Sequence, residues 1–231
     1  MYKFYKRQSG IVVSAHQNSN TTPPDTMTKQ IKRQATVRKP RRRDRISSTR
    51  VLERRGQTWE KLLAVGGRLM AEAGAARVSV QQILLDTGIS RGSFYGYCAS
   101  KTDLLVAIIE TVFTEGCATL ADLLNEPPKT VIPGIVAMYI DLWARHRHAL
   151  MLIPGVDAAT FARMRNAHQA YTTAMKQALD HAAKDARLRN ESAVYTFRVL
   201  TRTAVPLLRV YQDHPEGERL YRESMLALLI A

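Results

Sequence analysis

The residues with the most chemical information lie between positions 79 and 105, SVQQILLDTGISRGSFYGYCASKTDLL. This segment is rich in hydrogen-bond donors: a guanidinium, several hydroxyls, an amide and an ammonium. It shows no paired acid and base of the kind that catalysis requires. Such donors suit phosphate oxygens and the edges of bases. The candidates for contact with a nucleic acid are Ser79, Gln81, Arg91, Ser93, Tyr95, Tyr97 and Lys101.

Two short helices joined by a tight turn are expected to position these donors. Ser79, with a glutamine three residues later, forms a capping box that starts the first helix. Gly88 ends this helix, because glycine adopts the positive φ of a helix C-terminus at little cost. Ser90 caps the second helix and Ser100 a third. The pattern predicts a helix-turn-helix in which Phe94 points inward and the donors remain outside.

The second short helix is predicted to carry the base contacts. Arg91 stands at its start, where a guanidinium can pair with two acceptors of one guanine. Gln81, near the start of the preceding helix, is a second candidate reader. Ser93 can reach a base or a phosphate, and Ser79 can donate to a phosphate as well as cap its helix.

This segment resembles the DNA-binding region of the TetR/AcrR family of bacterial repressors, over roughly residues 58–110. The resemblance rests on Ser79, Ile83-Leu84, Thr87-Gly88-Ile89-Ser90, Gly92-Ser93-Phe94-Tyr95-Gly96-Tyr97, Ser100-Lys101 and Leu104-Leu105. It implies that Tyr95, Tyr97 and Lys101 contact the DNA backbone, and that residues 62–74 belong to the first helix of the head.

The chain departs from the family pattern at three places. Leu84 stands where alanine is usual and Cys98 where an aromatic residue is usual, so we expect Cys98 to be a smaller core filler. Val65-Gly66 replaces a pair of alanines in the first helix. We expect Gly66 to provide the room that Leu84 needs.

Positive charge is concentrated near the N-terminus. The net charge is +14, and residues 1–57 hold 15 Lys and Arg against 3 Asp and Glu, whereas residues 58–110 hold 5 of each kind. Segment 29–45, KQIKRQATVRKPRRRDR, has too few apolar residues to offset the entropy of the chain. We therefore predict a disordered basic extension over residues 1–47.

We expect this extension to follow phosphates or to place Arg41, Arg42 and Arg43 in a minor groove. The alternative is a solvated linker or an expression remnant, and a role at RNA or a membrane surface has no interleaved aromatic residues to support it. Residues 1–26 contain an apolar stretch too short for a signal peptide or a membrane span. Because Met27 resembles a natural start, we expect residues 1–26 to be an upstream extension.

Helical periodicity continues to the C-terminus with almost no strand alternation, so the predicted fold class is all-α. A three-helix head over residues 48–105 is expected to join a larger helical body over residues 106–231. The body helices are expected at 104–124, from Pro133 to about 148, from Asp157 to about 185, at 191–212 and at 216–231. Leu150–Gly155 is expected to be a break.

By its order along the chain, the resemblance implies that the body binds a small effector and forms a homodimer through residues 191–230. Pro206 should kink the 191–212 helix beside a pocket. The alternative is that the apolar stripes of these helices pack only on the core of their own subunit. The candidate pocket residues are Met138, Trp143, Met151, Phe161, Met164, His168, Tyr171, Met175, Phe197, Arg198 and Arg202.

The sequence favours a DNA-binding regulator over an enzyme, with double-stranded operator DNA as its partner. It contains no glycine-rich phosphate loop, no nucleophile elbow and no metal-ligand spacing, so we expect no cofactor and no metal. Cys98 and Cys117 are expected to be reduced in the cytoplasm. The alternative function is a non-specific architectural DNA-binding protein that uses the basic extension without an effector.

Overall fold

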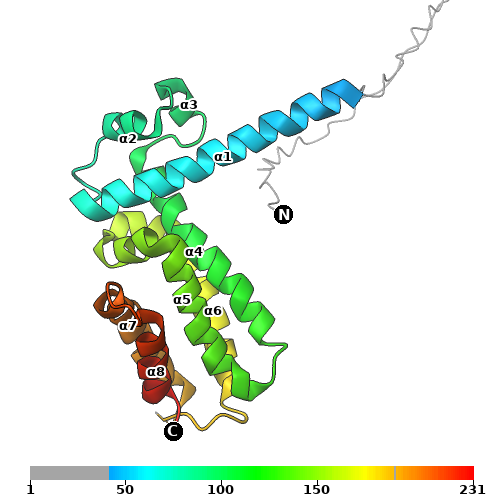
Figure 1. Cartoon of the computed structure of the whole chain (residues 1–231), viewed down its shortest axis with the longest axis vertical. Helices are drawn as coiled ribbons and strands as arrows, with labels where there is room; N and C mark the ends of the chain where they lie inside the picture. The colour runs from blue at the N-terminus through cyan, green and yellow to red at the C-terminus, as the bar shows by residue number, and fades with distance from the viewer. Residues whose placement is uncertain (1–41, 190) are drawn as a thin grey trace, which may run out of the picture. The chain divides into compact units, whose positions relative to one another are not determined.

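A computed structural model describes residues 42–189 and 191–231, with side chains from Arg50 onward (Figure 1). The described backbone forms α-helices, one 3-10 turn and a single bridge between Leu188 and Ile230, which confirms the predicted all-α class. The elements are α1 (Arg42–Ala73), α2 (Val80–Thr87), α3 (Arg91–Tyr95), α4 (Lys101–Leu123), α5 (Pro128–Leu152), η1 (Ile153–Gly155), α6 (Ala158–Ala182), α7 (Ala193–Tyr211) and α8 (Gly217–Leu229).

The caps that start and stop α2 and α3 are those predicted. The Ser79 hydroxyl accepts the Gln82 N–H, and the Gln82 side chain accepts the Ser79 N–H. Gly88 ends α2 with φ 68°, in the left-handed region. Ser90 caps α3 by accepting the Ser93 N–H. Three short-range signals therefore fix the turn between the two helices.

Helix α1 starts much earlier than residue 62, where the first helix was expected. It begins at Arg42, so residues 42–47 of the predicted extension are helical. The side chains of Arg42 and Arg43 are not described. Arg41 and the rest of residues 1–41 lie outside the described residues, and so do the predictions made for them.

Helix α4 joins the head, α1 to α3, to the body, α4 to α8. It packs against α1, α5 and α6, while α7 pairs with α8 beside α5 (Figure 1). The expected boundary after residue 105 falls inside this continuous helix. Within the described residues, α4 alone is long and apolar enough to cross a membrane, but half of its apolar window is buried in the protein. That burial is typical of a core helix.

Helix α5 is broken within its length rather than at its end. It starts at Pro128, one turn before the expected Pro133, because Pro128 can occupy the first helical position without losing a hydrogen bond. His146 leaves the helical region, with φ −135° and ψ 28°. The expected break at 150–155 is in fact the last residues of α5 followed by η1.

Gly66 makes room for a different residue from the one expected. A Cβ at Gly66 would lie 2.8 Å from Cδ2 of Leu104 and 3.5 Å from Cδ1 of Ile108. The glycine therefore lets α4 approach α1, and the prediction that it accommodates Leu84 is wrong.

Candidate nucleic-acid interface and ligand cavity

Helix α3 presents polar side chains outward from a buried anchor. Phe94 is fully buried, while Arg91, Ser93 and Tyr95 are exposed. The Tyr95 ring meets Phe94 edge to face at 5.3 Å. The Ser93 hydroxyl is shared with Ser90 at 2.9 Å. Arg91 and Tyr95 are thus placed as predicted on the outer face of a helix too short to be stable without its buried anchor.

Ser79 and Gln81, at the start of α2, differ in how many hydrogen bonds their side chains already form within the protein. Gln81 is exposed at the second position of the helix. The Ser79 hydroxyl accepts the Gln82 N–H and donates to the Gln82 side-chain oxygen, at 3.2 and 3.1 Å. Gln81 is therefore the freer of the two for contact with DNA.

Tyr97 is anchored to α1 rather than directed outward. Its hydroxyl donates to the carbonyl oxygen of Arg55 at 3.0 Å. Its ring stacks on Trp59, with centroids 5.7 Å apart and planes 11° apart, and the Arg55 guanidinium lies over it at 5.5 Å. The hydroxyl proton expected for a phosphate is thus used within the head, and Tyr97 is half-buried against α1 rather than fully outside like Tyr95; its contact with DNA stays a prediction.

Lys101 is also bound within the protein. Its ammonium donates to the carbonyl oxygens of Val78 at 2.7 Å and Ala76 at 3.1 Å. These carbonyls belong to the connection between α1 and α2, so Lys101 ties the start of α4 to the segment that introduces the helix-turn-helix. Two of its three protons are used in this contact.

Sequence reasoning missed two residues of α1 that support this surface. Arg55 and Trp59 are four residues apart, so both face the same side of the helix and meet Tyr97 from there. A second Arg55 contact, from Nη2 to the Gly96 oxygen, is long at 3.4 Å. The i, i+4 spacing of an arginine and a tryptophan was the available signal.

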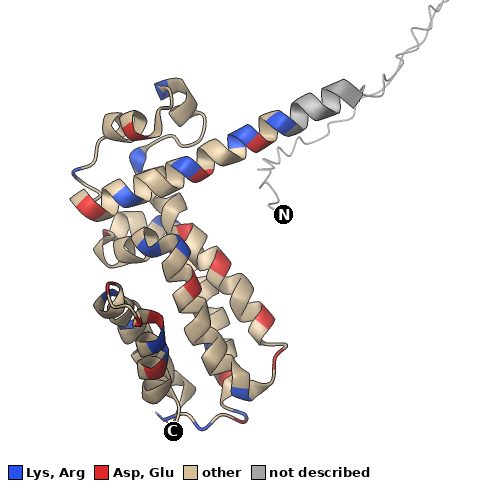
Figure 2. Cartoon of the chain, in the orientation of Figure 1, with Lys and Arg blue, Asp and Glu red and all other residues tan. Residues whose placement is uncertain are grey.

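The charges indicate which side of the described structure suits DNA. Lys and Arg occur along the outer part of α1 and at the start of α3, whereas α4 carries only acids after Lys101 (Figure 2). Phosphates are attracted to the first region and repelled by the second. The head face that carries Arg91 and Gln81 is therefore the candidate nucleic-acid interface.

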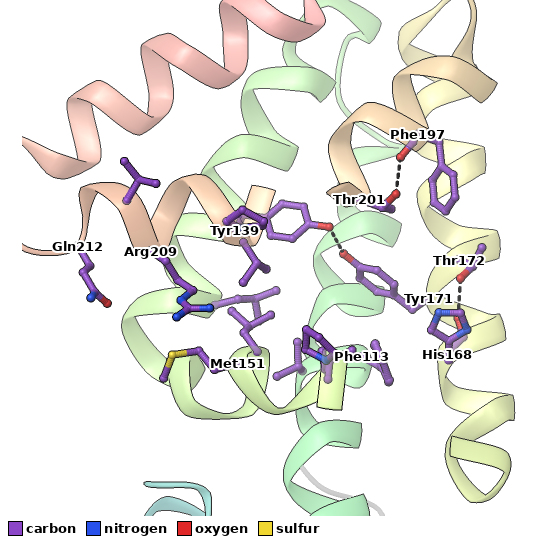
Figure 3. A pocket seen from close by; sticks show the side chains of 18 residues that line it. Phe113, Tyr139, Met151, His168, Tyr171, Thr172, Phe197, Thr201, Arg209 and Gln212 are labelled. Atoms are coloured by element: carbon purple, nitrogen blue, oxygen red, sulfur yellow. Dashed lines mark hydrogen bonds between the residues drawn. The ribbon is translucent and has the colours of Figure 1, made fainter. Parts of the chain in front are cut away.

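The body encloses a cavity of about 630 Å³ between α4, α5, α6 and α7 (Figure 3). Its volume is in the range of small-molecule sites, and its lining is mainly apolar and aromatic. The lining residues are Val112, Phe113, Tyr139, Leu142, Leu150, Met151, Ile153, Pro154, His168, Tyr171, Thr172, Phe197, Thr201, Val205, Pro206, Arg209, Val210 and Gln212.

Three aromatic groups carry the polar atoms deep in this cavity. The Tyr171 hydroxyl donates to the Tyr139 hydroxyl at 3.0 Å, and burial raises the pKa of both tyrosines. His168 lies edge to face with Phe113 and Phe161, and burial lowers its pKa. Both effects favour neutral side chains, so this part of the cavity suits an uncharged ligand group.

The predicted pocket residues are only partly brought together. Met151, His168, Tyr171 and Phe197 line the cavity, and so does Pro206, which was expected at a pocket wall. The other candidates are outside the lining. They are the buried core residues Met138, Met164 and Met175, the half-buried Trp143 and Phe161, and the exposed Arg198 and Arg202.

Arg198 and Arg202 are exposed and make their described contacts within α7. The Arg198 guanidinium lies 5.3 Å above the Tyr195 ring, and Arg202 donates to the Arg198 oxygen at 3.0 Å. The lining arginine is instead Arg209, two turns further along the same helix. The three arginines share one face of α7 by their spacing, so the position along the helix decides which of them reaches the cavity.

Two contacts lead from the walls of the cavity toward the head: one reaches the start of α4, directly after the head, and the other reaches α1. Arg163 of α6 forms an ion pair with Asp103 in the first turn of α4. After the break at His146, α5 meets α1, where a Cβ at Gly67 would lie 3.7 Å from Cβ of His148. Glu115 of α4 binds the His146 ring at 3.0 Å, and so holds the break in place.

The fold and the head together define a helix-turn-helix protein with a larger helical body that contains a cavity. The family model of the tetR family of bacterial regulatory proteins matches residues 62–108. YerO, an uncharacterized HTH-type transcriptional regulator of Bacillus subtilis (strain 168), is 28% identical over 98 residues, which are 41% of this chain and 34% of that protein. The chain thus aligns with about a third of the length of this relative.

Two solved structures share the architecture. The ketosteroid transcriptional regulator KstR2 of Mycobacterium tuberculosis has a TM-score of 0.63 at 16% identity, over 77% of this chain and 95% of that one. The complex of SmeT with triclosan has a TM-score of 0.57 at 22% identity, over 76% and 92%. At these identities the likeness shows the fold. The head, over residues 62–108, matches the tetR family model, which confirms the predicted resemblance.

Proposed function

We propose that the chain is a dimeric, sequence-specific transcriptional repressor that leaves its operator when a small apolar or aromatic molecule fills the cavity. One observation carries the proposal. Helix α4 begins directly after the recognition segment and is continuous as far as the cavity wall, where Val112 and Phe113 lie. A ligand that moves this wall also moves the start of α4, which Lys101 and Asp103 attach to the head and to α6.

Release requires that the ligand bind one arrangement of the helices better than the other. The segment from Leu150 to Pro154 supports this coupling, because it lines the cavity and follows directly on the residues of α5 that meet α1. The break at His146 separates this segment from the rest of α5. A shift of the segment can therefore reach the head without moving the whole helix.

The homodimer is proposed through residues 191–230, which hold α7 and α8. Leu200, Ala204 and Leu208 pack on the core of their own subunit, as the alternative interpretation expected. Val194 and Tyr195 remain exposed at 58% and 57%, on the same helix. Two heads in such a dimer would read half-sites about 34–36 Å apart on a near-palindromic operator.

The dimer is tested by sedimentation of the full-length protein. Tyr195→Asp places a charge in the proposed interface and should shift the protein to monomer at micromolar concentration. Leu85→Asp is the matched control, because Leu85 is 74% exposed on α2 in the head. An unchanged dimer in Tyr195→Asp would remove this face from the interface.

Selection from a random DNA library at physiological salt tests the function itself. Full-length protein and a chain that starts at Ser47 should both enrich one short near-palindrome, and the genes beside its genomic copies would indicate the effector. Enrichment without a motif, lost in the shorter chain, would instead establish the architectural alternative. The proposed place of action is the cytoplasm, on the nucleoid.

A further inference from the structure

The lining of the cavity is mainly apolar, but it contains one charged side chain at one end. Of the 18 lining residues, Arg209 alone carries a permanent charge. It forms no ion pair with any residue that the structure describes, and it lies in the last turn of α7. The other arginines of α7 with a described contact, Arg198 and Arg202, lie outside the lining.

The charged end and the aromatic end of the cavity are separate. Arg209 and Gln212 lie together at one end in Figure 3, while His168, Thr172 and Phe197 lie at the other. Arg209 and Gln212 are exposed, so their end of the cavity is open to solvent, whereas Tyr139 and Tyr171 are buried. A ligand that uses both ends is therefore charged near solvent and apolar inside.

Among the lining residues, Arg209 is the group that favours a negative charge on a ligand. Burial raises the pKa of both deep tyrosines, which shows that their surroundings oppose negative charge. The neutral His168 offers no compensating cation.

We propose that the cavity selects amphipathic monocarboxylic acids, with the carboxylate bound by Arg209 at the open end and the apolar body passing the Tyr139–Tyr171 pair. One guanidinium matches one carboxylate in charge and in bidentate geometry. The Gln212 amide can supply a further donor. Because the Tyr139 hydroxyl accepts from Tyr171, its own proton is free for an uncharged oxygen of the ligand. This inference rests on the proposed function, because it identifies the chemical class of the molecule that would release the repressor.

The test is calorimetric titration of the full-length protein, without DNA, with octanoate, octan-1-ol and octylamine. Octanoate should bind about tenfold or more tightly than the alcohol, and the amine should bind most weakly. Arg209→Gln should reduce the preference for octanoate over octanol to within about twofold. Arg202→Gln is the matched control, since Arg202 lies two turns earlier on α7 outside the cavity, and it should keep the preference.

Equal binding of octanoate and octanol, no binding of either, or an unchanged preference in Arg209→Gln would overturn the inference. A second pair, 4-phenylbutyrate and 4-phenylbutan-1-ol, shows whether the body of the acid is preferred as an aliphatic chain or as an aromatic ring.

Operator binding by the same three proteins separates the two proposals. Arg209→Gln should bind operator as wild type does and lose only its release by the acid. If none of the three proteins binds a specific operator, but wild type still binds octanoate more tightly than octan-1-ol, the proposed function fails and the carboxylate site is supported. If operator binding is intact and the acid is not preferred, the inference about the cavity fails alone.

Discussion

Arg163 and Asp103 form an ion pair across 60 residues of sequence, and it joins the start of α6 to the first turn of α4. The hydrogen bond from Arg163 is the main reason why the pKa of Asp103 is lowered, and the Ser100 hydroxyl adds to it. Asp103 is three residues beyond the cap of α4, so the pair links a cavity-lining helix to the end of the recognition segment.

Arg163→Met should therefore affect regulation more than stability. Because the pair is largely exposed, its loss should lower the free energy of unfolding by only about 0.5 kcal/mol. An acid with a lowered pKa stabilises the fold above its ordinary range and loses this effect as the pH falls through the lowered pKa. The difference from wild type should thus be present at pH 7 and vanish in strong acid.

The regulatory effect of Arg163→Met is measured as the change in operator affinity when ligand is added, which should shrink. Arg165→Met, on the same helix and also exposed, is the control. An unchanged response to ligand in Arg163→Met would show that the pair does not couple the two sites.

Lys101→Met distinguishes a positioning role from a phosphate contact. The loss of two charged hydrogen bonds to carbonyls should lower the free energy of unfolding by about 1–3 kcal/mol. Operator affinity should fall, while the slope of log affinity against log salt should stay the same. A slope smaller by about 0.9, without loss of stability, would establish the phosphate contact that the family resemblance implies.

Arg91→Ala should relax specificity at one base pair and cost about 1–3 kcal/mol of operator affinity. The reason is that a bidentate guanidinium discriminates guanine from other bases. The measurement is binding to a panel of operators, each with one base pair changed. Equal weakening on operator and random DNA would assign Arg91 to the backbone instead.

Gly66→Ala and Gly67→Ala form a matched pair on α1. Alanine is better than glycine in a helix by about 1 kcal/mol, and at Gly67 the new Cβ meets Ile108 and His148 at ordinary distances of 3.5 and 3.7 Å. Gly67→Ala should therefore stabilise the protein. Gly66→Ala should be less stable than Gly67→Ala by about 1–3 kcal/mol, because its Cβ would lie 2.8 Å from the buried Leu104. Urea unfolding measures both, and equal stability would contradict the close approach.

Removal of residues 1–41 leaves α1 complete and takes away a strongly basic segment. Operator affinity should fall and its salt dependence should flatten, because fewer counterions are released on binding. Specificity across the operator panel should stay the same. An unchanged salt slope would exclude the segment from DNA binding.

Local signals in the sequence were sufficient for the turn between α2 and α3. Ser79, Gly88 and Ser90 each act within a few residues, and each cap is present where it was predicted. The start of α1 was missed because the composition of residues 42–57 is polar and basic. Such a segment has no apolar stripe, which is the main signal for a helix.

The cavity was harder to predict because it depends on contacts between distant helices. Methionines 138, 164 and 175 have the chemistry of a pocket lining, yet each is buried against other core residues. Arg198, Arg202 and Arg209 are alike in sequence terms, and only the packing of α7 selects the third. Tyr97 and Lys101 similarly bond to Arg55, Ala76 and Val78, partners that no local pattern reveals.

The outer part of α1 has a consequence for how quickly its amide protons exchange with solvent. Residues 50–57 are all exposed, and Val51 and Leu52 are about 60% exposed, so this stretch buries almost no side chain. Apart from the contacts of Arg55 with Tyr97 and Gly96, this stretch is held only by its own helical hydrogen bonds, which are marginal in water. Its amides should exchange soonest on α1, while those near Leu62 and Met70 are protected by the core. A partner that lies along this stretch would slow the exchange there and would register as a footprint on the protein.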